Sequence, residues 1–393
     1  MAEYSPMMQH YLATKKQYND CILFYRLGDF YEMFFDDAIT VSKELELTLT
    51  GKDCGQEERA PMCGVPFHAA ETYINRLVSN GHKVAICEQM EDPKLAKGIV
   101  KREVIKVVTP GTNLNAQALD ETKNNYLFCI YYQGDVIGVS ICDFSTGDYF
   151  VTELKSENEL IDEINKFVPS EIIVNEYFAM SGIDLTAVNE KLNISMSTLE
   201  NWYFDEDSSI KKLLSHFKIS ALDGLGVKDY PTGIIAAGAL LTYLYETQKS
   251  DMSHIITLTP YTTGKYMLID SSSRRNLELV ETLREKQKRG SLIWVLDKTK
   301  TAMGARALRS MIEQPLINKD EIINRQNVVE ELCNNQIDRE ELREYMNPIY
   351  DLERLMTKIS CKSANPRDLI AFRNSLEMLP YLSLIHISEP TRH

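Results

Sequence analysis

The sequence predicts several domains, with α/β structure in the first two thirds of the chain and helices alone in the last third. Residues 1–115 mix short β-branched and aromatic runs with amphipathic segments. Residues 120–250 open with apolar runs separated by turn sequences, and residues 260–382 keep helical spacing almost throughout. At 393 residues the chain is also too long for one ordinary core, which favours two or three domains.

The first region, residues 1–115, is expected to form a small mixed α/β domain. The segment DDAITVSKELELTL has helical spacing, and APMCGVPFHAAETYINRLVSNG is typical of a Pro/Gly loop entering a helix that stops at Gly81. Pro110 and Gly111 end the last strand. Strands are expected at CILFYRLG, HKVAICEQ and REVIKVV.

The second region, residues 120–250, is expected to form an α/β sheet with flanking helices. Turn sequences at 133–135 and 145–148 divide its first part into a three-stranded meander. After the meander, the pattern predicts a helix at ENELIDEINKFV, a strand at SEIIVN, and helices around 208–218 and 232–247.

The third region, residues 260–382, is expected to be helical and truncated. In NPRDLIAFRNSLEML, Asn365 suits the N-cap and Pro366 the first helical position, and NPIYDLERLMTKIS is expected to repeat this design. The segment TKTAMGARALRSMIEQPL begins at a Thr cap and stops before Pro315. Residues 383–393 show neither an apolar stripe nor a cap, and we expect them to be a foreign or read-through tail.

Charge and cysteine content restrict the function classes. The net charge of −14 is uneven: −3 over residues 1–115, −12 over residues 116–250 and +1 over residues 251–393. A polyanion therefore suits the outer thirds better than the middle one. None of the eight cysteines forms a C-x-x-C pair, which disfavours a zinc site and fits a reducing cytoplasm. No secretory leader is evident, and the longest apolar run, GIIAAGALLTYLY, is too short to span a membrane.

The acidic residues of the meander suggest one enzymatic hypothesis. Asp143, with Asp135 and Asp148, would hold Mg²⁺ in a ribonuclease-H-like nuclease. The alternative is that hairpin turns favour Asp and that this surface is merely solvated. The sequence contains no G-x-x-x-x-G-K-[ST] or G-x-G-x-x-G loop.

A basic run and an aromatic–acidic run are the candidates for binding. KLAKGIVKREVIK places Lys97, Lys101 and Arg102 close together, where they would neutralise phosphates or simply line a solvated strand edge. In GDFYEMF, strand alternation puts Phe30 and Glu32 on one face and Tyr31 on the other. The ordinary interpretation of this second run is a buried strand that ends in a turn.

Six segments together resemble the MutS family of DNA mismatch-recognition proteins, of bacterial type. The resemblance implies a mismatch-binding domain (1–115), a ribonuclease-H-like connector (120–250) and the start of a helical core or lever domain (260–382). The segments follow the order of that family: FYRLGDFYEMFFDDA, PMCGVPFHA, VAICEQ, VTPGT, RRNLEL and LIWVLDKTKTAMGARALR.

The resemblance also implies what the chain binds. Phe30 would enter from the minor groove and stack on a mispaired base, and Glu32 would reach a base nitrogen as a protonated donor. Implied partners are mismatched double-stranded DNA, a repair protein such as MutL on the acidic connector, and a second family subunit, although this fragment is expected to be a monomer or weak dimer. ATP and Mg²⁺ belong to the full-length family. We expect no cofactor and no enzymatic activity in this chain. A scaffold that docks proteins is the third hypothesis.

Overall fold

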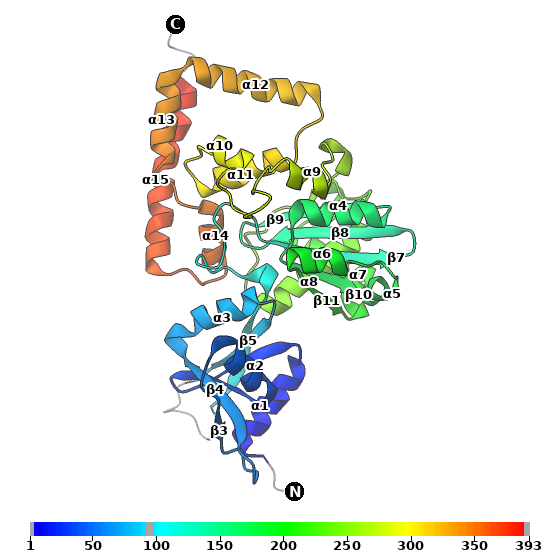
Figure 1. Ribbon diagram of the computed structural model, residues 1–393, viewed down its shortest axis with the longest axis vertical. Helices are drawn as coiled ribbons and strands as arrows, with labels where there is room; N and C mark the ends of the chain where they lie inside the picture. Colours follow the sequence, from blue (N-terminus) through cyan, green and yellow to red (C-terminus); the bar gives the residue numbers. More distant parts are fainter. Residues whose placement is uncertain (1–3, 92–97, 99, 389–393) are drawn as a thin grey trace.

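The computed structural model describes residues 4–91, 98 and 100–388 and shows two sheet regions followed by a helical region (Figure 1). Mixed α/β structure gives way to helices along the chain, which confirms the coarse prediction. The elements of the first sheet region are α1 (Pro6–Gln17), β1 (Cys21–Leu27), β2 (Phe30–Phe34), α2 (Phe35–Leu45), β3 (Thr50–Lys52), β4 (Ala60–Pro66), η1 (Phe67–Ala69), α3 (Ala70–Ser79), β5 (Lys83–Gln89), β6 (Arg102–Val108) and η2 (Pro110–Thr112).

The first sheet has the strand order β3-β4-β2-β1-β5-β6, and only β1 and β5 pair in parallel. The expectation of a loop before α3 was wrong, because residues 60–66 form β4 between β2 and β3. Pro61 and Pro66 lie near the two ends of this strand, where proline is tolerated. Helices α2 and α3 contribute to one buried cluster, and α1 contributes to a second.

The second sheet has the order β11-β10-β7-β8-β9-β12, and the predicted meander is confirmed as β7-β8-β9. Strands β10 and β11 pair in parallel with β7 and β10, respectively. Its elements are β7 (Tyr126–Gln133), β8 (Val136–Asp143), β9 (Asp148–Leu154), α4 (Glu157–Phe167), β10 (Glu171–Asn175), α5 (Glu176–Met180), α6 (Thr186–Leu192), β11 (Ser195–Leu199), η3 (Asn201–Phe204), α7 (Glu206–Phe217), η4 (Leu222–Leu225), α8 (Pro231–Gln248) and β12 (Thr259–Pro260).

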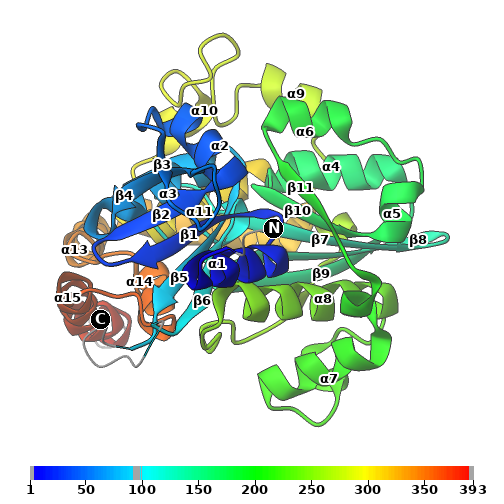
Figure 2. The same cartoon turned by 90° about the horizontal axis from the view of Figure 1, so that it is seen from below.

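Helices cover both faces of the second sheet. Figure 2 shows α8 and α7 along one face and α4 and α6 along the other, and each face has its own buried cluster. The apolar run 233–245 lies in α8 and is almost entirely buried. Among the helices of the described chain, none combines the length and the apolar character that crossing a membrane requires.

A buried carboxylate joins the two sheet regions. Glu171, at the start of β10, is fully buried. Its Oε2 atom accepts hydrogen bonds from Thr109 Oγ1 (2.5 Å) and Gly111 N (3.1 Å), and its Oε1 atom accepts one from Tyr243 Oη (2.6 Å). A Cβ atom at position 111 would lie 2.9 Å from Leu127 Cβ, so this approach requires glycine. The VTPGT segment is thus the structural joint between the regions.

The end of α8 makes a second connection to the first sheet. Gln248 Nε2 donates to the carbonyl oxygen of Val107 at 3.1 Å, and Lys249 Nζ donates to that of Val104 at 2.8 Å. Both acceptors belong to β6. These bonds attach β6 to the second region independently of Glu171.

The helical region contains η5 (Thr263–Lys265), α9 (Ser271–Asn276), α10 (Leu292–Leu296), α11 (Ala302–Glu313), α12 (Lys319–Asn334), α13 (Gln336–Met346), α14 (Leu352–Ser360) and α15 (Pro366–Ser388). The predicted Thr cap of α11 is confirmed, since Thr301 Oγ1 accepts from Gly304 N at 3.0 Å. Helix α14 does not repeat the predicted Asn-Pro start: Asp351 caps it, four residues after Asn347. Arg354 of α14 donates to the carbonyl oxygens of Asp120 and Lys123, which ties this region to the second one.

Candidate nucleic-acid interface

The turn between β1 and β2 places Phe30 at the molecular surface. Gly28 adopts a φ of +59° there, a conformation that favours glycine. The next residue, Asp29, accepts a hydrogen bond through its carbonyl oxygen from Phe67 N at 2.9 Å. The Phe30 side chain is 46% exposed, although its strand neighbours Tyr31 and Met33 are buried. Packing in the core does not account for an aromatic residue at this position, so the Phe30 ring is available to contact a ligand.

Tyr31 anchors the same strand from the opposite face. Its ring packs against Phe24 within the first core, and its hydroxyl donates to the Glu88 carboxylate on β5. Burial, together with this carboxylate, raises the pKa of Tyr31 far above its usual value, so the hydroxyl stays protonated and donates. The strand that carries Phe30 is therefore held both by packing and by a partly buried hydrogen bond.

Glu32 lies on the face of β2 that carries Phe30 and is paired with a lysine. Its Oε2 atom is 2.5 Å from Nζ of Lys52 on β3, and both side chains are partly buried. The strand partner of Glu32 on β4 is Gly64, where a Cβ atom would lie 3.5 Å from Glu32 Cγ. The small residue leaves room for the carboxylate side chain to lie over β4.

A second exposed aromatic residue lies at the same end of the sheet. Phe67 follows Pro66, the strand partner of Phe30, and is 43% exposed. The guanidinium of Arg26 stacks on the Phe67 ring, with its Cζ atom 3.8 Å from the ring centroid. Neither Arg26 nor Phe67 was a predicted site residue. The "PFHA" segment contained the aromatic residue, but its position beside Phe30 depends on strand pairing.

The structure separates the three predicted phosphate contacts. Lys97 lies outside the described residues. Lys101 remains a candidate because its side chain is exposed, although it forms an ion pair with Glu103 at 2.7 Å. Arg102 is only 8% exposed. Its Nε and Nη1 atoms donate to the carbonyl oxygens of Arg26 and Val100, both at 2.8 Å. Arg102 therefore stabilises the edge of the sheet, and its burial argues against the predicted phosphate contact.

The metal-binding hypothesis for the meander is wrong. Asp143 is fully buried, and its two oxygens accept hydrogen bonds from Asn124, Asn125 and Ser145. Asp148 pairs with it across β8 and β9, but Asp135 precedes β8 and lies at the opposite end of that strand. Within the described residues, no three His, Cys, Asp or Glu side chains come together as a possible metal site. Asp143 organises a turn.

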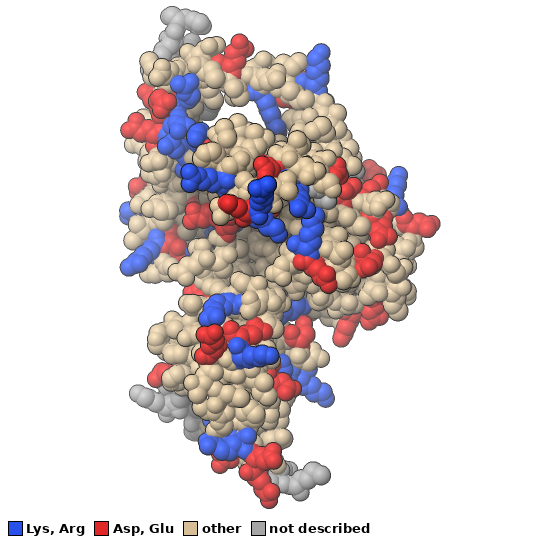
Figure 3. All heavy atoms as spheres, in the orientation of Figure 1, with Lys and Arg blue, Asp and Glu red and all other residues tan. Residues whose placement is uncertain are grey.

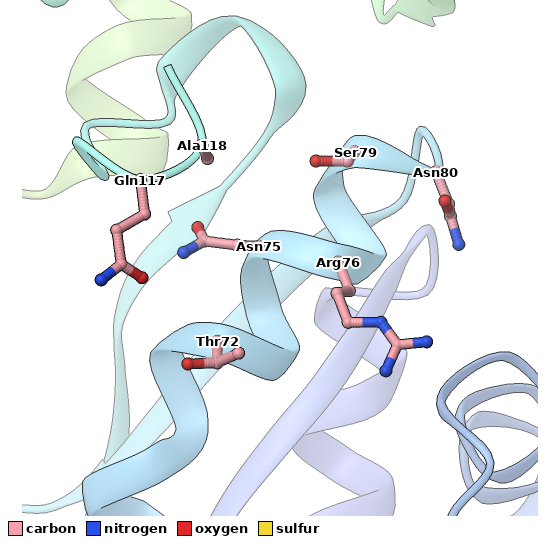
Figure 4. Close-up of a pocket in the computed structure, with 7 residues that line it drawn as sticks. All are labelled: Thr72, Asn75, Arg76, Ser79, Asn80, Gln117 and Ala118. Atoms are coloured by element: carbon pink, nitrogen blue, oxygen red, sulfur yellow. The ribbon is translucent and has the colours of Figure 1, made fainter. Parts of the chain in front are cut away.

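A polar pocket of about 370 Å³ lies between α3 and the segment that leads out of the first region (Figure 4). Arg76 is the only charged residue among those lining it in the described structure. The adjoining Asn75 Oδ1 atom accepts from Asn113 Nδ2 at 3.2 Å, which bridges the helix and the segment. The residues that line the pocket are Thr72, Asn75, Arg76, Ser79, Asn80, Gln117 and Ala118. Their amide and hydroxyl groups favour a pocket that is filled with water.

Sequence comparisons define the class of this chain. Models of MutS domain I, MutS domain II and MutS domain III match residues 5–117, 125–256 and 272–393. Three similar proteins are each named DNA mismatch repair protein MutS: those of Lachnoclostridium phytofermentans (64% identical), Ruminiclostridium cellulolyticum (54%) and Acetivibrio thermocellus (52%).

The chain belongs to the MutS family and carries its first three domains. The alignments cover 97–98% of this chain and 41–44% of each of these relatives. The chain thus spans about two fifths of the length of the relatives it matches.

Proposed function

We propose that the chain recognises mispaired bases in duplex DNA through Phe30, with Glu32 as the second reading group. One observation carries the proposal: a half-exposed aromatic ring stands beside a carboxylate on one face of an otherwise well-packed strand. An aromatic wedge can stack on any base, because every base has a π-face. A mispaired step is already poorly stacked, so a wedge enters it more readily than a matched step.

The energies predict weak binding that depends strongly on salt. Stacking one base on an aromatic side chain contributes about 1–3 kcal/mol, whereas bending a site costs on the order of 1–6 kcal/mol. Phe30 alone does not offset the bend, and phosphate contacts must supply the difference. Lys101 is one such contact in our proposal, and Phe30 then supplies the preference for the mispair.

The test compares two exposed apolar residues of the same domain. We expect Phe30→Ala to reduce the affinity for a G·T-mismatched duplex by about five- to hundredfold, the loss of one stacked base, and to change matched-duplex affinity little. Ile39→Ala is the matched control, because Ile39 has similar exposure but lies on α2, outside the candidate interface. Fluorescence anisotropy at about 50 mM and 200 mM salt measures both. Equal losses on matched and mismatched duplex in Phe30→Ala would contradict the wedge.

We further propose that the second region acts as a connector that docks a repair partner such as MutL. Acidic side chains gather over this region in Figure 3, in agreement with its net charge of −12. Tyr177 and Met180 are exposed on α5 and Trp202 is exposed on η3, and Asn201 Nδ2 donates to Glu176 Oε2 between the two elements at 2.7 Å. An aromatic patch in an acidic setting suits a basic and apolar partner.

The remaining proposals concern fold, enzymatic activity and assembly. The ribonuclease-H-like description of the connector is supported by a meander followed by two strands that pair in parallel beside β7. We propose that these 393 residues bind DNA without hydrolysing ATP, since their sequence contains no G-x-x-x-x-G-K-[ST] loop. We also propose a monomer or weak dimer that works in the cytoplasm, where chromosomal DNA is found.

A further inference from the structure

The ion pair between Glu32 and Lys52 connects two strands that do not pair with each other. Strand β4 lies between β2 and β3 in the sheet. The ammonium of Lys52 lies 5.6 Å from the ring centroid of buried Phe34 and reaches the Glu32 carboxylate at 2.5 Å. Phe30, Glu32 and Phe34 alternate along β2 and so share one face. Lys52 therefore extends over the same face as the exposed ring of Phe30.

The charge of this pair matters beside DNA. An unpaired carboxylate next to the phosphate backbone would repel any duplex. In the part of the chain that the structure describes, Lys52 is the one cation that forms an ion pair with Glu32. With the ammonium attached, the pair has no net charge, and its partial burial limits screening by solvent.

The pair also changes what Glu32 can do chemically. The ammonium of Lys52 has only donors, so the Glu32 oxygen that it contacts serves as an acceptor. Lys52 engages Oε2, so Oε1 is the oxygen left to meet a base. In this arrangement we infer that Oε1 accepts from an N–H group of a base.

We propose that Lys52 is a positioning residue for mismatch recognition, which acts by neutralising Glu32 and holding its carboxylate on the face that carries Phe30. This inference rests on the proposed function. Without Lys52, the Glu32 charge opposes binding, and its carboxylate is free to turn away from the base.

A double-mutant cycle tests this role. The variants are Lys52→Met, Glu32→Gln and the double variant, measured by anisotropy on matched and G·T-mismatched duplexes. We expect Lys52→Met to weaken mismatch binding about tenfold and to reduce the preference over matched duplex. In the Glu32→Gln background the same change should cost less than about twofold, because no carboxylate charge remains to be neutralised. Lys52→Arg should retain most of the affinity, and exposed Lys43→Met is the control for a general loss of positive charge.

Each alternative outcome has a separate meaning. Equal losses from Lys52→Met in both backgrounds would overturn the inference, because Lys52 would then contact phosphate independently of Glu32. A wild-type chain with no preference for the mismatched duplex would instead defeat the proposed function itself. Circular dichroism verifies that each variant folds. If Lys52→Met does not fold, Lys52→Gln, which also removes the charge, takes its place in the cycle.

Discussion

The buried carboxylate of Glu171 should control the joint between the first two regions, and replacing it by alanine is the sharpest test of the fold. The substitution removes the acceptor of the Gly111 N–H and the Tyr243 O–H groups, both of which are buried. Thr109 Oγ1 keeps a second contact, at 2.9 Å, with Thr112 Oγ1. Two buried donors therefore lose their partner.

The magnitude follows from these two donors. Each unsatisfied buried donor costs about 1–3 kcal/mol, which gives a sum of about 2–6 kcal/mol. Removing a buried charge recovers part of this, since the carboxylate no longer has to be desolvated, but the Lys83 ammonium, 4.0 Å from Glu171 Oε1, loses an ion-pair partner. We expect a net loss of about 3 kcal/mol in the local opening free energy, equivalent to a roughly hundredfold faster amide exchange. Glu171→Gln keeps one carbonyl acceptor and should lose about 1–2 kcal/mol.

Amide hydrogen exchange read by mass spectrometry on peptides covering 105–115 is the assay, because global unfolding of several domains is not two-state. The matched control is Glu176→Ala, an exposed acid just beyond the same strand. It should leave exchange at 109–112 unchanged. If these amides exchanged as slowly in the Glu171→Ala variant as in the wild type, the assignment of Glu171 as the joint would be refuted.

Two further predictions concern the second region. Trp202→Ala should weaken binding of MutL protein to the chain by at least about tenfold, as expected for a central aromatic contact. Ile256→Ala, on another exposed surface, should leave this binding unchanged. Equal binding by both variants would exclude the aromatic patch. Burial lowers the pKa of His254 to about 4 from its usual 6.5. As the pH falls, the imidazole is therefore protonated in the unfolded chain before it is protonated in the folded chain. The free energy of unfolding should consequently drop between pH 6.5 and about 4. The amide-exchange protection of peptides around residue 254, measured across this range, should fall less steeply for His254→Asn than for the wild type, and parallel curves would show that His254 is not responsible.

Elements with strong local patterns could be predicted from the sequence. The apolar runs of β1, β5 and β7 and the Thr301 cap of α11 each contain their own signal. Strand β4 could not be predicted, because its glycine and prolines are typical of a loop and only pairing with β2 and β3 makes the segment extended. The two residues of β12 are too short for any periodicity.

The same distinction holds for the candidate site. Phe30 and Glu32 share a face by strand alternation, which a sequence reveals directly. The partner of Glu32 is 20 residues away on another strand, and no local pattern connects it to Lys52. Arg102 sits in a basic run that suggests a solvated edge, yet tertiary packing buries it. Contacts between distant segments decide these roles.

Because of the two hydrogen bonds from the end of α8 to β6, substitutions in the second region can affect the first region. Strand β6 pairs with β5, and β5 carries Glu88, which accepts the hydrogen bond of Tyr31 next to Phe30. Helix α8, which belongs to the second region, is thereby connected through β6 and β5 to the strand that carries Phe30. We therefore predict that substitutions at Gln248 or Lys249 also weaken mismatch binding, although both side chains contact β6 and not the strand that carries Phe30.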